Sequence, residues 1–241
     1  MIVYAAADLH GNLPPVPEDA ELILLAGDIC PDFRPYGNRG GLVDTGGIQQ
    51  HRWMMKEFLT WAADIAERGI ELAYIWGNHD FVGEQPWHVR EITNHVKGTF
   101  LQDNERGVGG VNIWGTPWVP GLPYWAFYGD DRKLALRAEA IPDGLDVLMT
   151  HGPPAYAGDY IPTSEKQRNK YGNFGGAHVG DPTLNERILA MSAPPKVVIC
   201  GHIHEDRGAH EVAGVPVYNV AAVDAQYRLH EHPWTRLYEL G

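Results

Sequence analysis

Short apolar runs alternate with polar segments along most of the chain, and several runs end in polar side chains. The run from Leu72 to Trp76 stops at Gly77 and is followed at once by Asn78-His79-Asp80. Such an ending predicts a buried parallel strand that stops at the mouth of an α/β site, where open sheets bind their ligands. Apolar runs also predict strands over 2–7, 22–26, 111–115, 145–150 and 197–200.

Between some of these runs lie segments whose apolar residues have the spacing of a helix. Between Gln49 and Arg68 the apolar positions recur every three or four residues, which predicts an amphipathic helix that Gly69 ends. These apolar positions are Met54, Phe58, Trp61 and Ile65. Further helices are predicted over 86–96, 132–140 and 182–191, with Trp87, Ile92 and Val96 of the first facing inward.

The order strand, helix, strand in the first third favours right-handed crossovers and a largely parallel sheet. Residues 30–48 and 155–181 are rich in glycine and polar side chains and are predicted as loops, the second lying on the surface and bordering the site. The tail, 208–240, predicts short alternating strands. No repeat or linker interrupts 1–241, which predicts a single domain.

Charge and composition narrow the function. The 241 residues are 44% hydrophobic and carry a formal net charge of −12, so the basic surface needed for long nucleic acids is missing. An acidic protein also repels anionic substrates unless bound cations reverse the local field. Cys30 and Cys200 follow apolar runs and predict buried thiols in a reducing compartment. With no signal-peptide pattern after Met1 and no run long enough to cross a membrane, we expect a cytoplasmic protein.

Eleven of the twelve histidines divide into two groups. One group follows apolar runs closely and comprises His10, His79, His151, His202 and His204. The other lies in polar or helical contexts, is expected to be solvated, and comprises His51, His88, His95, His210, His230 and His232.

Five predicted strand ends therefore carry metal-ligand side chains. They read Asp8-x-His10, Gly27-Asp28, Asn78-His79, His151 and His202-x-His204. This set is too large for one tetrahedral zinc ion and suits two adjacent metals that share a carboxylate. Mixed imidazole and oxygen ligands favour Mn, Fe or Zn over Ca or Mg. Each motif alone is weak, but their shared position at strand ends makes chance a poor explanation.

The charge of such a centre indicates a reaction. Two divalent ions, two aspartates and a bridging hydroxide leave about one net positive charge, which suits a phosphate ester. Paired metals lower the pKa of bound water and clamp the oxygens of an in-line displacement. The leaving alkoxide then needs a proton, which a histidine outside the ligand set commonly supplies.

The ordered motifs, which span residues 8–204, resemble the calcineurin-like metallophosphoesterases. That resemblance implies a four-layer α-β-β-α sandwich of mixed sheets with a dinuclear metal site at the strand ends. It implies that Asp8, His10, Asp28 and His204 bind one metal, that Asp28 bridges to a second completed by Asn78, His151 and His202, and that His79 is the general acid.

The segments 113–118, 125–127, 148–154 and 200–205 are similar to the small branch of MPPED phosphodiesterases, which act on phosphodiesters, cyclic nucleotides among them. For the tryptophans and prolines in these segments, core packing and a substrate-wall role remain equal alternatives.

The motif around Asp28 departs from that of the related protein Ser/Thr phosphatases. Pro31 stands where those enzymes have the aspartate that orients the catalytic histidine, which argues against a protein phosphatase. Asp32 and Arg34 are expected in a solvated loop, so the partner of His79 stays open. Asp80 is a candidate for ligating, orienting or stabilising the loop.

The leading hypothesis is a metal-dependent phosphodiesterase acting on small organic or nucleotide diesters, with cyclic nucleotides as one candidate class. A phosphomonoesterase or nucleotidase uses the same centre and is the alternative. A non-catalytic metal-binding scaffold is a third, disfavoured because such proteins usually lack one or more ligands and this chain lacks none.

Overall fold

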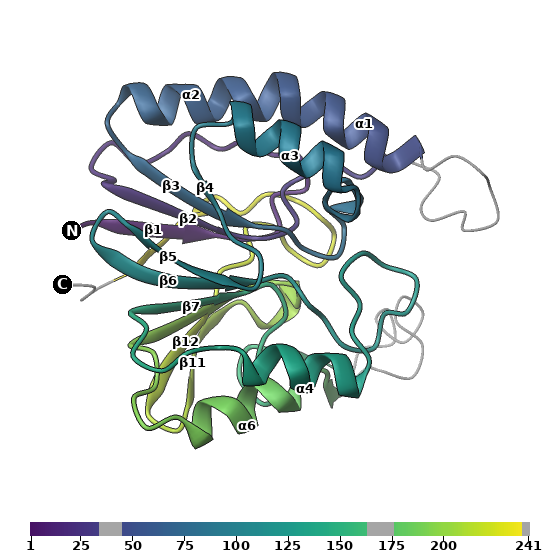
Figure 1. The fold of residues 1–241 in the computed structure, drawn as a ribbon, viewed down its shortest axis with the longest axis vertical. Coiled ribbons are helices and arrows are strands. Elements are labelled where there is room, and N and C mark those ends of the chain that lie inside the picture. The colour runs from purple at the N-terminus through teal and green to yellow at the C-terminus, as the bar shows by residue number, and fades with distance from the viewer. Residues whose placement is uncertain (34–44, 163–175, 238–241) are drawn as a thin grey trace.

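Two mixed β-sheets face each other and carry helices on their outer faces, as a computed structural model of the chain shows (Figure 1). The structure describes residues 1–33, 45–162 and 176–237. This arrangement confirms the predicted four-layer sandwich.

The first sheet has the strand order β13-β1-β2-β3-β4. Its members are β1 (Val3–Ala6), β2 (Leu22–Ala26), β3 (Glu71–Ile75), β4 (Thr99–Phe100) and β13 (Thr235–Leu237). Strands β1 to β4 are parallel, and β13 pairs antiparallel with β1.

The second sheet has the order β11-β12-β10-β7-β6-β5. Its four inner strands are parallel and its two edge strands antiparallel. They are β5 (Asn104–Val108), β6 (Val111–Thr116), β7 (Val147–Thr150), β10 (Val197–Cys200), β11 (Gly208–Val212) and β12 (Val215–Asn219). The largely parallel sheet expected from the strand order of the first third is confirmed in β1 to β4. The order of strands alone does not reveal where the chain changes sheet.

Helices cover both outer faces (Figure 1). Over the first sheet lie α1 (Thr45–Trp53), a π-helical turn (Met54–Phe58), α2 (Leu59–Glu67) and α3 (Pro86–His95). Over the second lie α4 (Asp131–Glu139) and α6 (Pro182–Ala190). Among the residues described, no helix combines the length and apolar character needed to cross a membrane.

The continuous apolar runs have a direct structural cause. In β2, Leu22 and Leu24 pack between the sheets, whereas Ile23 and Leu25 pack under the helices. A strand buried on both faces has no polar alternation, so it reads as an unbroken apolar run.

Two predictions about packing were wrong. Trp87, expected in the core, is 58% exposed, while its neighbour His88, expected in solvent, is buried at 2%. In the predicted surface loop 155–181, the side chains of Ala157 and Asp159 are fully buried. That segment also forms a small ribbon of β8 (Tyr160–Ile161) and β9 (Ala177–His178), while 163–175 lies outside the described residues.

Candidate metal centre

The eight predicted site residues lie at one end of the sandwich, where strands of both sheets end. Asp8, Asp28, Asn78 and His79 follow β1, β2 and β3 of the first sheet. His151, His202 and His204 follow β7 and β10 of the second, and His10 follows Asp8 by two residues. Contacts that join the sheets here include His204 Nε2 to Asp8 Oδ1 at 3.3 Å, His151 Nε2 to Asp28 Oδ2 at 3.3 Å, and His202 N–H to Asp8 Oδ2 at 2.9 Å.

The turns that carry these side chains have an unusual backbone. Asp8, His10, Asp28 and His202 have φ values of 56°, 44°, 51° and 70°. The left-handed region costs a residue with a Cβ roughly 1–2 kcal/mol, so four such residues in one place represent considerable strain. Strain of this kind persists only where the surrounding structure holds it, and it gathers at functional sites.

Glycine is required before several of these residues. A Cβ on Gly77 would collide with the carboxylate of Asp28, and one on Gly201 with that of Asp8. A Cβ on Gly27 would lie 2.6 Å from Nδ1 of His151. The glycines that end the apolar runs therefore leave room for the carboxylates and imidazoles.

Asp28 is the central carboxylate. Its Oδ1 accepts the backbone N–H of His79 at 2.7 Å, and its Oδ2 faces imidazole nitrogens of His151 and His10 at 3.3 and 3.9 Å. Burial opposes ionisation, yet the surrounding imidazoles hold the pKa of Asp28 well below its ordinary value. An ionised oxygen between imidazoles from both sheets is placed as a bridging ligand would be.

One cluster of ligand atoms is formed by Asp8, His10 and His204, all within 4.8 Å of one another. Nδ1 of His204 bonds the carbonyl of Asp224 at 3.2 Å, which leaves Nε2 to face Asp8. Nε2 of His10 is buried and has no hydrogen-bond partner. A buried nitrogen without a partner is rare unless a bound group satisfies it, so this donor set fits a divalent metal ion.

A second cluster is formed by Asp8, Asp28 and His151, also within 4.8 Å. Nδ1 of His151 bonds the carbonyl of Ala26 at 2.9 Å, and Nε2 bonds Oδ1 of Asn78 at 2.9 Å. The carbonyl of Ala26 accepts from Nδ1, which leaves Nε2 facing Asn78 and Asp28. Although burial opposes a charge on this ring, Asp28 and Asp8 raise the pKa of His151 to about 9.

Nε2 of His151 faces the oxygens of Asp28 and Asn78, so these three atoms surround a place that a cation could share. His202 lies beside it, with ring centroids 5.2 Å apart. Burial and the charge of His151 lower the pKa of His202 to about 3, which leaves it neutral and able to act as a metal ligand. These residues fit a second divalent ion.

His79 belongs to neither of these clusters, but it forms a third with His10 and Asp32, whose ligand atoms also lie within 4.8 Å of one another. Asp32 orients the ring of His79. Its Nδ1 lies 2.7 Å from Oδ1 of Asp32, and its Nε2 lies 4.0 Å from Oδ2 of Asp28. The prediction of a solvated Asp32 was wrong, because the side chain is only 18% exposed. Arg34 lies outside the described residues.

Neighbouring groups set the charges of Asp32 and His79. Burial works against ionisation of both side chains. The imidazoles of His10 and His79 nevertheless hold the pKa of Asp32 far below its usual range, and the charges of Asp28 and Asp32 raise the pKa of His79. The result is an ionised carboxylate bound to a histidine that keeps its proton, as a general acid requires.

Comparison with known proteins identifies the family. A family model described as calcineurin-like phosphoesterase matches residues 1–206. The chain belongs to the calcineurin-like phosphoesterase family. It is 30% identical over 138 residues to metallophosphoesterase domain-containing protein 1 of Homo sapiens, a match that covers 57% of this chain and 38% of that protein. It is 34% identical over 110 residues to a UPF0046 protein of Caenorhabditis elegans, covering 45% of this chain and 24% of that one.

The match thus spans well under half the length of these relatives. One solved crystal structure aligns with a TM-score of 0.66 over 92% of this chain and 91% of its own, at 14% identity. A likeness at that level of identity shows the shared fold.

In this calcineurin-like phosphoesterase, Asp80 stabilises the loops rather than orienting His79. Its carboxylate accepts the backbone N–H groups of Ile29, Cys30 and Gly77 at 3.2, 2.8 and 2.8 Å. Burial and the nearby charge of Asp28 raise the pKa of Asp80 to about 6. Asp80 therefore joins the loop after β2 to the loop after β3.

Gln50 of α1 performs a similar task that the sequence did not indicate. Its amide donates to the carbonyl of His79 at 2.7 Å and accepts the N–H of Val82 at 3.0 Å. The backbone of the general acid candidate is thus fixed from the helical layer.

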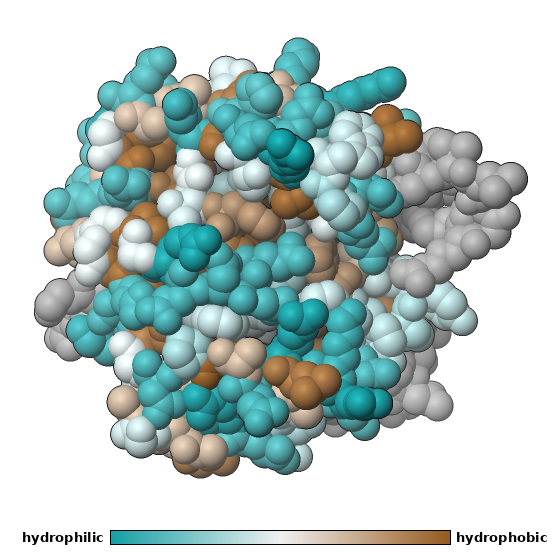
Figure 2. Space-filling view, viewed as in Figure 1, coloured by the Kyte–Doolittle hydropathy of each residue, from teal (hydrophilic) through white to brown (hydrophobic). Residues whose placement is uncertain are grey.

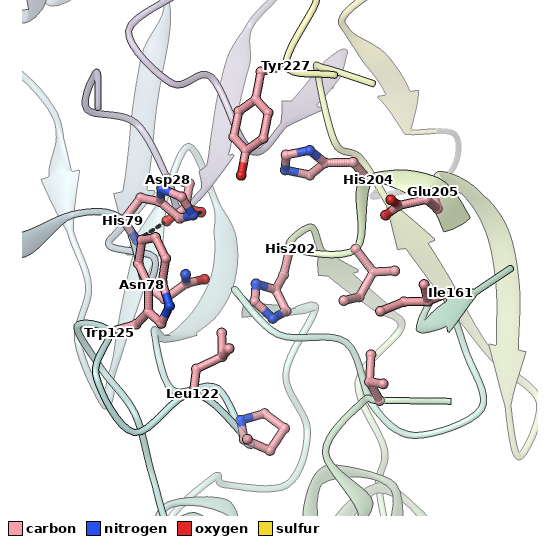
Figure 3. Close-up of a pocket in the computed structure, with 14 residues that line it drawn as sticks. Asp28, Asn78, His79, Leu122, Trp125, Ile161, His202, His204, Glu205 and Tyr227 are labelled. Carbon is pink, nitrogen blue, oxygen red and sulfur yellow. Dashed lines mark hydrogen bonds and ion pairs between the residues drawn. The ribbon is translucent and has the colours of Figure 1, made fainter. Parts of the chain in front are cut away.

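A pocket of about 470 Å³ opens over the candidate metal centre (Figure 3). Asp28, Asn78, His79, His202 and His204 form its polar side. The rest of the lining is mostly apolar and comprises Pro120, Gly121, Leu122, Trp125, Ile161, Val179 and Ile203, with Glu205 and Tyr227 as polar exceptions.

Two tryptophans of the segments 113–118 and 125–127 have different surroundings. Trp125 lines the pocket, and its ring centroid lies 4.2 Å from that of His79. Trp118 instead donates through Nε1 to Asp103 at 2.9 Å and packs beneath Lys133. Ile161 and Val179 place both ends of the 155–181 segment at the pocket, as expected.

Tyr227 was missed because nothing in the tail pattern marks it. Its hydroxyl points into the pocket (Figure 3), and its ring lies 4.7 Å from that of His10 and 5.1 Å from that of His204. The turn that carries it is closed by Asp224, which pairs with Arg228 at 2.6 Å and whose carbonyl orients His204. One turn therefore positions both a ligand candidate and a pocket hydroxyl.

Proposed function

We propose that this protein is a metal-dependent phosphodiesterase that hydrolyses small organic phosphodiesters. The observation that carries the proposal is the Asp32–His79 pair, joined at 2.7 Å, with the imidazole lining a pocket beside two clusters of metal-ligand side chains. A metal-binding scaffold has no need of an oriented, protonated histidine at that position.

Two groups of side chains would hold the metals. Asp8, His10, Asp28 and His204 suit one ion, and Asp28, Asn78, His151 and His202 suit the other. When bound, two such ions bind phosphate oxygens as Lewis acids and lower the pKa of water to make it a nucleophile near neutral pH. The set of imidazole and carboxylate ligands favours Mn, Fe or Zn.

The protein's own residues handle the proton of the leaving group. Nδ1–H of His79 donates to the carboxylate of Asp32, so the proton available to the leaving group is the second proton of the imidazolium, on Nε2. As the ester bond breaks, the leaving oxygen takes this proton, and Asp32 stabilises the imidazole throughout. Trp125 covers one side of the ring and keeps water from competing for the proton.

The pocket lining favours a diester over a monoester. None of the residues described as lining the pocket is lysine or arginine. A diester has one negative charge and a second organic group, which the wall of Leu122, Trp125 and Ile161 can bury. A monoester dianion has more charge to neutralise and no second organic group to place on that wall. Cyclic nucleotides are one class of such diesters, and the free buried thiols Cys30 and Cys200 suit a cytoplasmic location.

The test compares bis(p-nitrophenyl) phosphate with p-nitrophenyl phosphate, using purified Mn-loaded protein. We expect kcat/KM for the diester to exceed that for the monoester at least tenfold. His79→Ala should lose about 100-fold or more of kcat, the usual contribution of a general acid. Asp28→Ala should lose both activity and bound metal, whereas His95→Ala on the outer side of α3 should behave as wild type. Preference for the monoester would favour the phosphomonoesterase alternative, and metal-loaded protein inert on both would favour the scaffold.

A further inference from the structure

Glu205 is a pocket residue that the fold leaves unused. It lies in the short 3₁₀ turn His204–Asp206, one residue beyond a metal-ligand candidate. Its carboxylate points toward the pocket beside His204 (Figure 3). Oε1 of Glu205 is buried and has no hydrogen-bond partner.

The neighbours of Glu205 are fully engaged in the structure. His204 bonds the carbonyl of Asp224 and faces Asp8. Asp206 accepts the backbone N–H of Tyr160 at 2.8 Å. The residues on both sides of Glu205 thus make bonds within the protein, whereas Oε1 of Glu205 has no donor.

A buried acceptor without a donor opposes folding, and native proteins keep such groups where a ligand satisfies them. The adjacent wall offers only apolar side chains, Ile161, Val179 and Ile203. No lysine or arginine lies among the lining residues that the structure describes. A donor carried by a bound molecule would satisfy this oxygen.

We propose that Glu205 determines substrate specificity by accepting a hydrogen bond from an N–H group on the organic part of the phosphodiester. The phosphate lies at the metal-ligand clusters, and the organic group extends along the apolar wall to the carboxylate. A protonated amine matches best, because a hydrogen bond between an ammonium and a carboxylate is about twice as strong as a neutral one. This inference rests on the proposed phosphodiesterase function and names its substrate class.

Three chromogenic diesters test the proposal in Mn-loaded protein. The p-nitrophenyl ester of phosphoethanolamine has a cationic N–H donor, that of phosphocholine has the charge without the donor, and bis(p-nitrophenyl) phosphate has neither. We expect wild type to prefer the ethanolamine ester to the choline ester at least tenfold in kcat/KM. Glu205→Ala should lose about tenfold on the ethanolamine ester, or about 1.4 kcal/mol. It should change the other two esters less than threefold.

Two further variants serve as controls. Glu205→Gln keeps the shape and an acceptor oxygen, so it should retain part of the ethanolamine preference even if the alanine variant disturbs the turn. Glu186→Ala, on an exposed position of α6, makes the same charge change far from the pocket and should leave all rates unchanged.

A binding measurement separates this proposal from the proposed function. Calorimetry on Mn-loaded His79→Ala, with and without Glu205→Ala, gives affinities for the ethanolamine and choline esters without turnover. Loss of the ethanolamine preference on removing Glu205 supports the proposal even if wild type proves inert, an outcome that would sink only the phosphodiesterase function. Equal affinity for the two esters, or an equal loss on all three in the rate assay, overturns it.

Discussion

In three histidines of the site, one ring nitrogen bonds a protein group. That bond directs the other ring nitrogen inward, toward the site. The fixing partners are the carbonyl of Ala26 for His151, the carbonyl of Asp224 for His204 and the carboxylate of Asp32 for His79. Only His79 has a charged side chain in this role. A backbone carbonyl sets a tautomer, whereas a carboxylate also stabilises the protonated ring, which suits an acid rather than a ligand.

Asp32→Asn should therefore separate orientation from charge. The amide oxygen still accepts the bond from Nδ1 of His79, but the negative charge that favours the protonated ring is gone. We expect kcat on bis(p-nitrophenyl) phosphate to fall about 10- to 100-fold, with KM and bound metal nearly unchanged. Asp64→Asn, at an exposed position of α2, is the matched control. A kcat equal to that of wild type would show that Asp32 has no part in the proton transfer.

Asp32 also shows which part of the site could not be predicted from the sequence. The ligand candidates were found from sequence because each follows an apolar run, a signal carried by the chain itself. Asp32 is displaced by one position from the phosphatase motif, and only the turn around Pro31 brings its carboxylate to His79. Glu205 and Tyr227 carry no pattern at all, since their place in the pocket depends on strands far away in sequence.

At the scale of elements, Asp80 holds two loops together. Its carboxylate accepts three buried backbone N–H groups, two from the loop after β2 and one from the loop after β3. These loops carry Asp28, Asn78 and His79. The position of the central carboxylate relative to the acid therefore depends on a residue that reaches neither metal cluster.

Asp80→Ala should leave those three donors without an acceptor. Since a buried unsatisfied group costs about 1–3 kcal/mol, we expect the free energy of unfolding in urea to fall by about 3 kcal/mol or more. Asp80→Asn should lose less, because its oxygen can still accept. An alanine variant that unfolds at the same urea concentration as wild type would show that the carboxylate of Asp80 does not hold these loops together.

The start of α6 offers a prediction about pH. Asp181 caps this helix by accepting the N–H of Thr183 at 2.8 Å, and its burial raises its pKa. A carboxyl whose folded pKa is raised contributes stability below its unfolded pKa of about 4, and this contribution is lost as pH rises through the folded value. Relative to Asp181→Asn, which caps without titrating, wild type should lose stability over that interval. Urea midpoints for both proteins at several pH values from about 3 to 7 would measure the difference, and parallel curves would contradict the prediction.

Prediction from sequence was uneven at this scale. Buried strands and the helix with Met54, Phe58 and Ile65 were found because their apolar spacing is strong. The edge strand β5 was missed because its burial pattern is mostly exposed. Trp87 was misplaced because apolar spacing alone does not decide which side of a short helix faces the core.

At the scale of the whole molecule, the candidate centre joins the two sheets. Asp8 and Asp28 come from the first sheet, while His151, His202 and His204 come from the second. A metal bound by both sets links residues about 200 positions apart and binds only the folded chain. Such a ligand stabilises by about 2.7 kcal/mol when its concentration is 100 times its Kd, and two sites add their effects.

Removing the metals should therefore lower stability as well as activity. We expect the thermal midpoint of Mn-loaded protein to drop by several degrees on adding EDTA and to return on adding excess Mn. Asp28→Ala should have a midpoint that EDTA barely changes, because the shared carboxylate is gone. His79→Ala, which leaves the ligand set intact, should respond to EDTA as wild type does while lacking activity. That contrast separates metal binding from catalysis, and an EDTA response in Asp28→Ala as large as that of wild type would show that the metals are held elsewhere.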